Sequence, residues 1–111
     1  MAYFHPSLTL EKWSSLASPK QILNIASELT RAKHALEKEQ TVNMQKSLER
    51  ALELIDLTVV DSKWRQKRKE LLRLREHLGG FYIGAYASVD ELHCALKLLV
   101  QFDKESARVP V

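Results

Sequence analysis

The sequence has few of the residues that break helices or link segments covalently. Its 111 residues include only three glycines and three prolines, too few for the many tight turns of an all-β architecture. The single cysteine, Cys94, has no intramolecular partner, so the chain has no disulfide framework. We therefore expect an all-α fold in a reducing compartment, the cytoplasm.

Long hydrophobic runs are also missing. No apolar stretch approaches the about 20 residues that a transmembrane helix requires, and residues 1–5 lack the basic and apolar regions of a signal peptide. The composition, 45% hydrophobic and 28% charged, is that of an ordinary globular protein. We expect one domain over residues 1–111, with irregular tails at 1–6 and 106–111 and no membrane partner.

Apolar residues recur at spacings of three and four, the pattern of amphipathic helices. This periodicity predicts a short helix within residues 7–16 and long helices at about 19–38, 42–60, 62–78 and 89–105. The connections between the long helices are short, so consecutive helices are expected to lie side by side and antiparallel. The predicted fold is an antiparallel up-and-down four-helix bundle with a short N-terminal helix.

The expected helix boundaries follow from capping residues. Ser18 followed by Gln21 has the spacing of a capping box, in which two side chains satisfy free backbone N–H groups at a helix start. Ser88 and Glu91 repeat this spacing. Two consecutive glycines begin at Gly79 and favour a left-handed stop, so we expect the third long helix to end there.

The third long helix is strongly basic between residues 63 and 77. On a helical wheel its outer face carries Arg65, Lys69 and Arg73, spaced suitably for contacts with phosphate groups. One interpretation is a surface that binds nucleic acid. The other is a solvated face whose charge is balanced by acids of the preceding helix, namely Glu49, Glu53 and Asp56.

Arg75 falls on the apolar side of the same helix, between Leu71 and Leu78. A guanidinium group there needs a carboxylate, because an unpaired charge in a core is very costly. We expect a buried ion pair, with Asp103 as one candidate partner and the acids of the second long helix as others. An anion-binding site is the alternative.

The sequence contains no recognisable motif for catalysis or for metal or cofactor binding. The Glu-x-x-His pattern of di-metal bundles does not occur, and His93 beside Cys94 lacks the second pair of ligands that a zinc site requires. No phosphate-binding loop, dinucleotide fingerprint or nucleophile elbow occurs either. We therefore expect no metal and no cofactor and assign no catalytic residue; an enzyme that uses Arg75 and His77 stays open as an alternative.

Several apolar residues exceed what one core requires. Seven of them lie outside the main stripes of the second and fourth long helices or follow the third helix: Leu54, Leu57, Phe81, Tyr82, Tyr86, Leu98 and Phe102. Exposed apolar patches of this kind often mark subunit interfaces. Two interpretations remain open, a cap over the core and an interface with another subunit.

The stretch from Ile25 to Leu36, followed by a second amphipathic stretch from Glu49 to Ile55, resembles the helical HEPN-type domains. These are small bundles, often dimeric, that accompany minimal nucleotidyltransferases or act as ribonucleases. The resemblance covers about a third of the chain. Active ribonucleases of this group have four to six residues between an arginine and a histidine, whereas three residues separate Arg73 from His77. The resemblance therefore implies a dimeric helical partner protein without a ribonuclease site.

Together these features predict a non-enzymatic interaction or regulatory module that self-associates or binds a helical protein partner. The alternative is an RNA- or DNA-binding protein that uses the basic helix at 63–77. The formal net charge of +3 permits this alternative without requiring it.

Overall fold

The computed structural model describes residues 9–82 and 88–108, which are mainly helical and contain no strand. The elements in order are α1 (Leu10–Ser14), α2 (Ser18–Glu37), α3 (Thr41–Val59), the 3₁₀ helix η1 (Ser62–Lys67), α4 (Arg68–Tyr82), α5 (Val89–Val100) and the 3₁₀ helix η2 (Ser106–Arg108). The radius of gyration is 13.1 Å, as expected for a compact chain of this length. The all-α prediction is confirmed.

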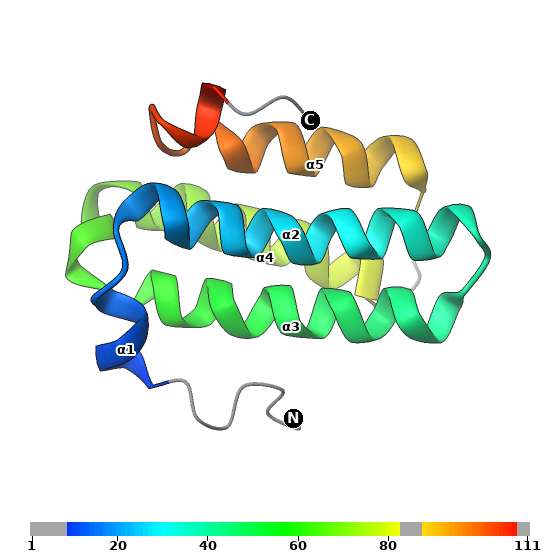
Figure 1. Cartoon of the computed structure of the whole chain (residues 1–111), viewed down its shortest axis with the longest axis horizontal. Helices are drawn as coiled ribbons and strands as arrows, with labels where there is room; N and C mark the ends of the chain where they lie inside the picture. Colours follow the sequence, from blue (N-terminus) through cyan, green and yellow to red (C-terminus); the bar gives the residue numbers. More distant parts are fainter. Residues whose placement is uncertain (1–8, 83–87, 109–111) are drawn as a thin grey trace.

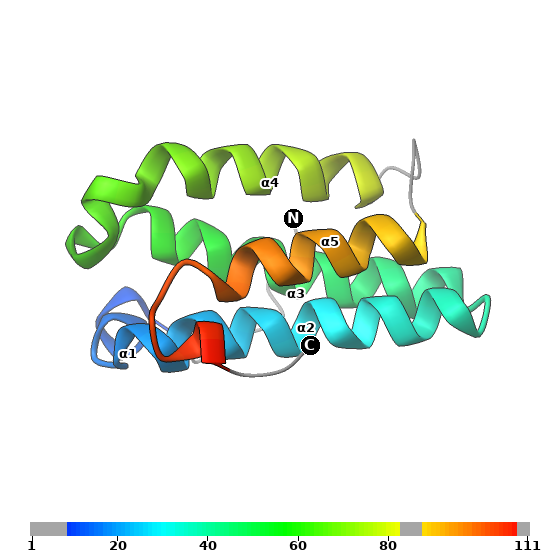
Figure 2. The ribbon, with the colours of Figure 1, turned by 90° about the horizontal axis from the view of Figure 1, so that it is seen from above.

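The four long helices, α2 to α5, pack side by side along the longest axis of the molecule (Figure 1). α2 packs against both α3 and α5, and α3 also packs against α4. α4 and α5 make less contact with each other than any of these three pairs does. Figure 1 and Figure 2 agree that α4 and α5 also lie further apart than the helices of those pairs. The side between α4 and α5 is therefore the most open side of the helix assembly.

The core is formed by the apolar seams of these helices. Each seam places a buried residue every three or four positions, for example Ile22, Ile25 and Leu29 on α2. The other long helices contribute the fully buried side chains Leu48, Ile55, Leu71, Leu78, Leu92 and Leu99. Because burying one such side chain contributes about 1.5 to 3 kcal/mol, the seams supply much of the free energy that holds the helices together.

α4 differs from the prediction at both ends. The expected first turns are instead the 3₁₀ helix η1, and the helix passes through Gly79 and continues to Tyr82. A glycine inside a helix costs only about 1 kcal/mol relative to alanine. Phe81, beyond the glycines, is fully buried in the core. Burial of Phe81 offsets the cost of the glycines, so the helix does not stop at them.

α5 is shorter than predicted. It ends at Val100 rather than near residue 105, and the chain then turns into η2, which packs against α2. The segment 106–111, expected to be irregular, thus begins with a short 3₁₀ helix. The N-terminal tail expected at residues 1–6 lies outside the described residues.

Of the two predicted capping serines, one is an N-cap in the structure and the other is not. Ser88 caps α5, because its hydroxyl accepts a hydrogen bond from the backbone N–H of Glu91 at 3.1 Å. Ser18 does not cap α2; the cap position is held by Ala17, and Ser18 is the first helical residue. Gln21 does not reach back to the helix start, since its side chain is buried in contacts with other elements.

Candidate functional site

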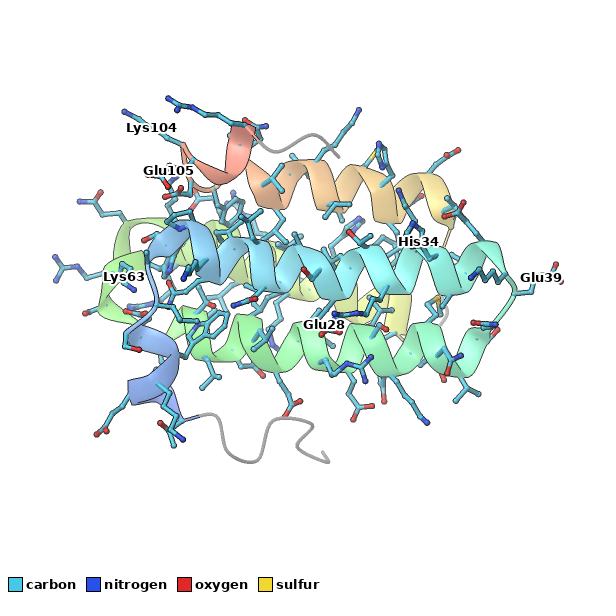
Figure 3. All side chains as sticks on the ribbon, in the orientation of Figure 1. Glu28, His34, Glu39, Lys63, Lys104 and Glu105 are labelled. Atoms are coloured by element: carbon cyan, nitrogen blue, oxygen red, sulfur yellow. The ribbon has the colours of Figure 1, made fainter. Side chains whose placement is uncertain are left out.

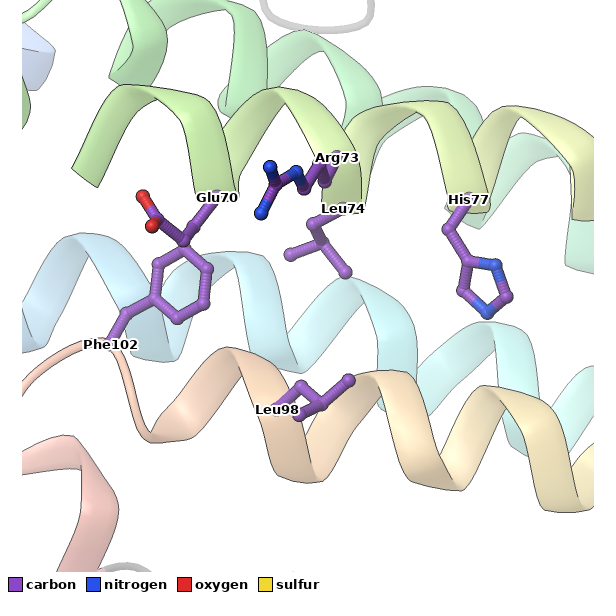
Figure 4. A pocket seen from close by; sticks show the side chains of 6 residues that line it. All are labelled: Glu70, Arg73, Leu74, His77, Leu98 and Phe102. Carbon is purple, nitrogen blue, oxygen red and sulfur yellow. The ribbon is translucent and has the colours of Figure 1, made fainter.

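An apolar groove runs between α4 and α5, on the open side of the molecule (Figure 4). Its volume is about 400 Å³, and the residues that line it are Glu70, Arg73, Leu74, His77, Leu98 and Phe102. Leu74 and His77 extend from α4 toward α5 (Figure 4). The volume lies within the range of sites that bind ligands or the side chains of a partner. We call this site the α4/α5 groove.

Leu98 leaves 61% of its surface exposed at this groove. Leu99, the next residue, is fully buried, because successive residues of an α-helix point about 100° apart. Phe102, just beyond the end of α5, is half-buried and lines the same groove. The groove therefore combines an apolar floor with a leucine that still has most of its surface in water.

Two opposite charges border the groove on α4. Glu70 and Arg73 are both exposed and lie one helical turn apart. Neither forms an ion pair with the other or with any other residue in the described ranges. Further along, the ring of His77 packs edge-on against Phe81, with centroids 4.6 Å apart. Among the residues that the structure describes, the acid and the base at this groove therefore have no ion-pair partner.

Leu54 and Leu57, which the sequence places outside the core stripe, pack on the core in the structure. Leu54 is only 4% exposed, and Leu57 is partly buried. α1 covers this side of α3: Trp13 lines the same open pocket as Leu54, and its indole N–H donates a hydrogen bond to Thr58 Oγ1 at 3.0 Å. Leu54 is therefore a core residue and not a candidate for a subunit interface.

The aromatic residues after the glycines also pack inward. Phe81 is fully buried, and Tyr82 is half-buried, with its hydroxyl donating to Glu49 Oε2 at 3.4 Å. Gln45 donates a hydrogen bond to the backbone carbonyl of Tyr82 at 3.3 Å. Tyr86 lies outside the described residues. Of the seven predicted residues, Leu98 and Phe102 are the ones that line the groove.

Arg75 forms an ion pair with Asp56 of α3 and not with Asp103. Its guanidinium donates to both carboxylate oxygens of Asp56, through Nε and, at 3.2 Å, through a terminal nitrogen. Asp56 is one of the acids of the second long helix that were the other candidate partners, but the two side chains are 39% and 42% exposed, so the pair is not buried. The hydrogen bond with Asp56 raises the pKa of Arg75, while partial burial lowers it. The pair joins α3 to α4 at the surface, with the guanidinium already occupied by a carboxylate.

A buried polar cluster lies where α1, α2 and η1 meet, and the sequence analysis missed it. Gln21 is fully buried. Its Nε2 donates to the carbonyl of Trp13 at 2.8 Å and to Asp61 Oδ2 at 3.0 Å, and its Oε1 accepts from Trp64 Nε1 at 2.7 Å. The sequence feature that could have revealed this cluster is the polar residue Gln21 on the apolar stripe of α2, four residues before Ile25. We use the name Gln21 cluster for four residues: Trp13, Gln21, Asp61 and Trp64.

Lys63 extends this cluster toward α1 (Figure 3). Its ammonium donates to the backbone carbonyls of Ser14 at 3.0 Å and Leu16 at 2.6 Å, and lies 3.6 Å from Asp61 Oδ2. Burial by itself raises the pKa of Asp61, but hydrogen bonds from Gln21 and the Lys63 backbone, together with the Lys63 charge, hold that pKa below its ordinary value. Asp61 is therefore a carboxylate at neutral pH, and its role is structural.

A second ion-pair network joins α2 to α3. Glu28, which is buried, accepts hydrogen bonds from Arg31 at 2.6 Å and from Arg50 at 2.9 Å. Arg50 also donates to Ser47 at 3.2 Å. Each oxygen of the Glu28 carboxylate is thus engaged by an arginine, so this network serves the packing of the two helices.

The three basic residues predicted on the outer face are exposed in the structure. Arg65 of η1 and Lys69 and Arg73 of α4 form no ion pair or side-chain hydrogen bond with the residues described. Two of the acids expected to balance them are engaged elsewhere: Asp56 pairs with Arg75 of α4, and Glu49 contacts a tyrosine hydroxyl. We call Arg65, Lys69 and Arg73 the basic face.

Within the ranges 9–82 and 88–108, no three His, Cys, Asp or Glu side chains are grouped so that they could hold a metal ion. His93, next to the exposed Cys94, has its Nδ1 3.4 Å from Lys33 Nζ. None of the helices described here combines the length and hydrophobicity needed to cross a membrane. Comparisons with protein-family models, with curated proteins and with solved structures found no match to this chain.

Proposed function

We propose that this protein is a non-enzymatic interaction module that self-associates through the α4/α5 groove. In this proposal the four long helices form an antiparallel up-and-down bundle, and a second copy covers its open side. The observation that carries the proposal is Leu98, which is 61% exposed beside an apolar groove of about 400 Å³. Covering Leu98 removes apolar surface from water, and this is the dominant favourable term in most protein associations.

The charges at the groove favour a second copy as the partner. In a two-fold interface, each contact between two residues is made twice, with the roles of the copies exchanged. When the α4 helices of two copies lie antiparallel, Glu70 of one copy meets Arg73 of the partner subunit, and the reverse pair forms as well. Both charges lack an ion-pair partner among the described residues, and the dimer supplies one for each.

The available surface is large enough for a dimer. The molecule is 36 Å long, and its helices run along this axis (Figure 1). A stable interface buries about 800 Å² per partner, which along this length requires a strip about 22 Å wide. Two neighbouring helices, each about 10 to 12 Å in diameter, provide about 20 to 24 Å. α4 and α5, with 15 and 12 residues, are only about 22 and 18 Å long, so η1 before α4 and the segment around Phe102 after α5 must also contribute to the interface.

Two further features agree with the proposal. A dimeric helical protein is what the resemblance to HEPN-type domains implies. Cys94 is exposed and has no disulfide partner, as is usual for proteins of reducing compartments such as the cytoplasm. We therefore propose a cytoplasmic, dimeric module.

Sedimentation equilibrium between about 1 and 100 μM tests the proposal with two matched variants. Leu98→Gln places a polar group at the groove and is expected to raise the dimer Kd at least about tenfold, equivalent to about 1.4 kcal/mol. Leu72→Gln is the control, because Leu72 is 47% exposed but lies about 200° from Leu74 around α4, away from the groove. A wild-type protein that stays monomeric, or equal dimer Kd values for the two variants, contradicts the proposal.

A further inference from the structure

Positive charge is concentrated on η1 and the first part of α4. Residues 62–75 contain seven lysines and arginines but one acid, Glu70, a net charge of +6. The remainder of the chain, with ten basic and thirteen acidic side chains, carries −3. α4 lies at one edge of the molecule (Figure 2), so this charge is at the periphery and not enclosed between helices.

Four of the seven cations contact groups of the chain itself. Lys63 donates to carbonyls at the end of α1, Lys67 donates to the carbonyl of Phe102 at 2.7 Å, and Arg68 donates to the carbonyl of Val59 at 2.8 Å. Arg75 pairs with an aspartate of α3. The remaining three are the basic face, whose side chains are exposed and lack an intramolecular partner among the residues described.

We propose that Arg65, Lys69 and Arg73 bind the phosphate backbone of a nucleic acid. Planar guanidinium groups match phosphate geometry, and interfaces with nucleic acids are rich in lysine and arginine. Protein–protein interfaces are depleted in lysine and have apolar centres, whereas Leu72 is the one large apolar side chain exposed among the described residues of η1 and α4. The charge and chemistry of this face therefore fit phosphates better than an acidic protein.

The aromatic residue of η1 is not available for stacking against bases. Trp64, the aromatic residue nearest to the basic face in sequence, is 4% exposed and donates its indole N–H to Gln21, so it offers no stacking surface. Contacts made to phosphates alone give binding that is independent of sequence and strongly dependent on salt. Three phosphate contacts give a slope of log Kd against log salt of about 2.7 for duplex DNA and about 2.1 for a single strand.

This inference does not rest on the proposed dimer, although the two surfaces share Arg73. A phosphate and Glu70 of the partner subunit compete for this arginine, so nucleic acid is expected to favour the monomer. The Leu98→Gln variant should therefore bind nucleic acid at least as tightly as the wild-type protein. Its behaviour separates the two proposals, because loss of the dimer leaves the basic face intact.

Fluorescence anisotropy with labelled 20-nucleotide single strands and 20-base-pair duplexes of mixed sequence, RNA and DNA, at about 20 mM salt tests the inference. The triple variant Arg65→Gln, Lys69→Gln and Arg73→Gln is expected to raise Kd at least about tenfold. The matched control, Lys20→Gln, Lys46→Gln and Lys97→Gln, removes the same charge from exposed positions on α2, α3 and α5. Its Kd is expected to stay within about threefold of the wild-type value.

Three results overturn the inference. The first is no binding by the wild-type protein up to about 100 μM at this salt concentration. The second is equal loss of affinity in the triple variant and its control, which shows a response to net charge alone. The third is binding of polyglutamate as tight as that of the oligonucleotides, which assigns the face to an acidic polypeptide. Because the three residues have no intramolecular partner among those described, the triple variant should keep wild-type stability in urea.

Discussion

Gln21 and Asp61, forty residues apart in the chain, are joined by a hydrogen bond of 3.0 Å from the glutamine amide to Asp61 Oδ2. Asp61 also accepts a hydrogen bond at 3.0 Å from the backbone N–H of Lys63 and so caps η1. The two side chains, 0% and 5% exposed, are shielded from water. The start of α2 and the start of η1 are thus held together by polar bonds inside an otherwise apolar region.

Gln21→Ala is expected to lower the free energy of unfolding by about 3 kcal/mol, because it leaves Asp61 and the Trp64 indole without their buried partner. Urea unfolding measures this change. Gln66→Ala, at an exposed glutamine of η1, is the control and should change stability by less than about 0.5 kcal/mol. A loss below about 0.5 kcal/mol for Gln21→Ala as well would contradict the role of the Gln21 cluster in stability.

Asp61 makes stability depend on pH at the acidic end. Its pKa is lower in the folded protein than the about 3.9 of an unfolded chain, so its contribution is complete above about pH 5. The contribution falls as the pH drops through the unfolded value and is lost below the folded value. The difference in free energy of unfolding between wild type and Asp61→Asn should be constant from about pH 5 to 7 and shrink as the pH falls below about 4. A difference that grows as the pH falls would contradict this assignment.

Gly79→Ala is expected to raise the free energy of unfolding by about 1 kcal/mol. Gly79 lies inside α4, and a Cβ added there meets no atom within 4 Å, so the gain in helix propensity comes without a clash. Thermal unfolding followed by circular dichroism measures the change. A lower melting temperature would indicate that α4 stops at the glycines in solution, as the sequence pattern alone predicts.

Cys94 provides a direct probe of the proposed dimer. It is exposed and lies one helical turn before Leu98, so it is on the same side of α5. A short bismaleimide should link two copies through this single cysteine, with the yield rising with protein concentration through the dimer Kd. The Leu98→Gln variant should give at most about a tenth of that yield at the same concentration. An equal yield would indicate random collision instead of a specific contact.

Elements that depend on local sequence were predicted well. The seams of α2 and α3 follow directly from the spacing of residues such as Ile25, Leu29 and Leu48, because a period near 3.6 places them on one face. Ser88 caps α5 through a contact three residues away, which needs no tertiary information. Leu98 was also identified from the width of the apolar stripe on its helix.

Arg75 shows why the helical-wheel prediction of a core position was wrong in α4. The wheel assumed 100° per residue from Trp64 onward, but η1 is a 3₁₀ helix, which turns about 120° per residue. The phase error accumulated over η1 rotates every later residue relative to Trp64, so Trp64 does not mark the core side of α4. Within α4 itself, Arg75 lies about 40° beyond Leu71, at the edge of the stripe formed by Leu71, Leu74 and Leu78. At this edge Arg75 meets Asp56 of α3 at the surface instead of entering the core. An exposed pair of this kind contributes only about 0 to 1 kcal/mol, so Arg75→Ala should cost little stability.

The helical class of this protein and the residues of its main seams follow from local sequence, since these depend on periodicity and on contacts within one helical turn. The neighbours that each helix packs against depend on the tertiary structure. The burial of Leu54 under α1, the hydrogen bonds of Gln21 and the extension of α4 to Phe81 all depend on segments distant in the chain or on packing in the core. The α4/α5 groove also depends on the tertiary structure, because it forms only where α4 and α5 lie side by side without close contact.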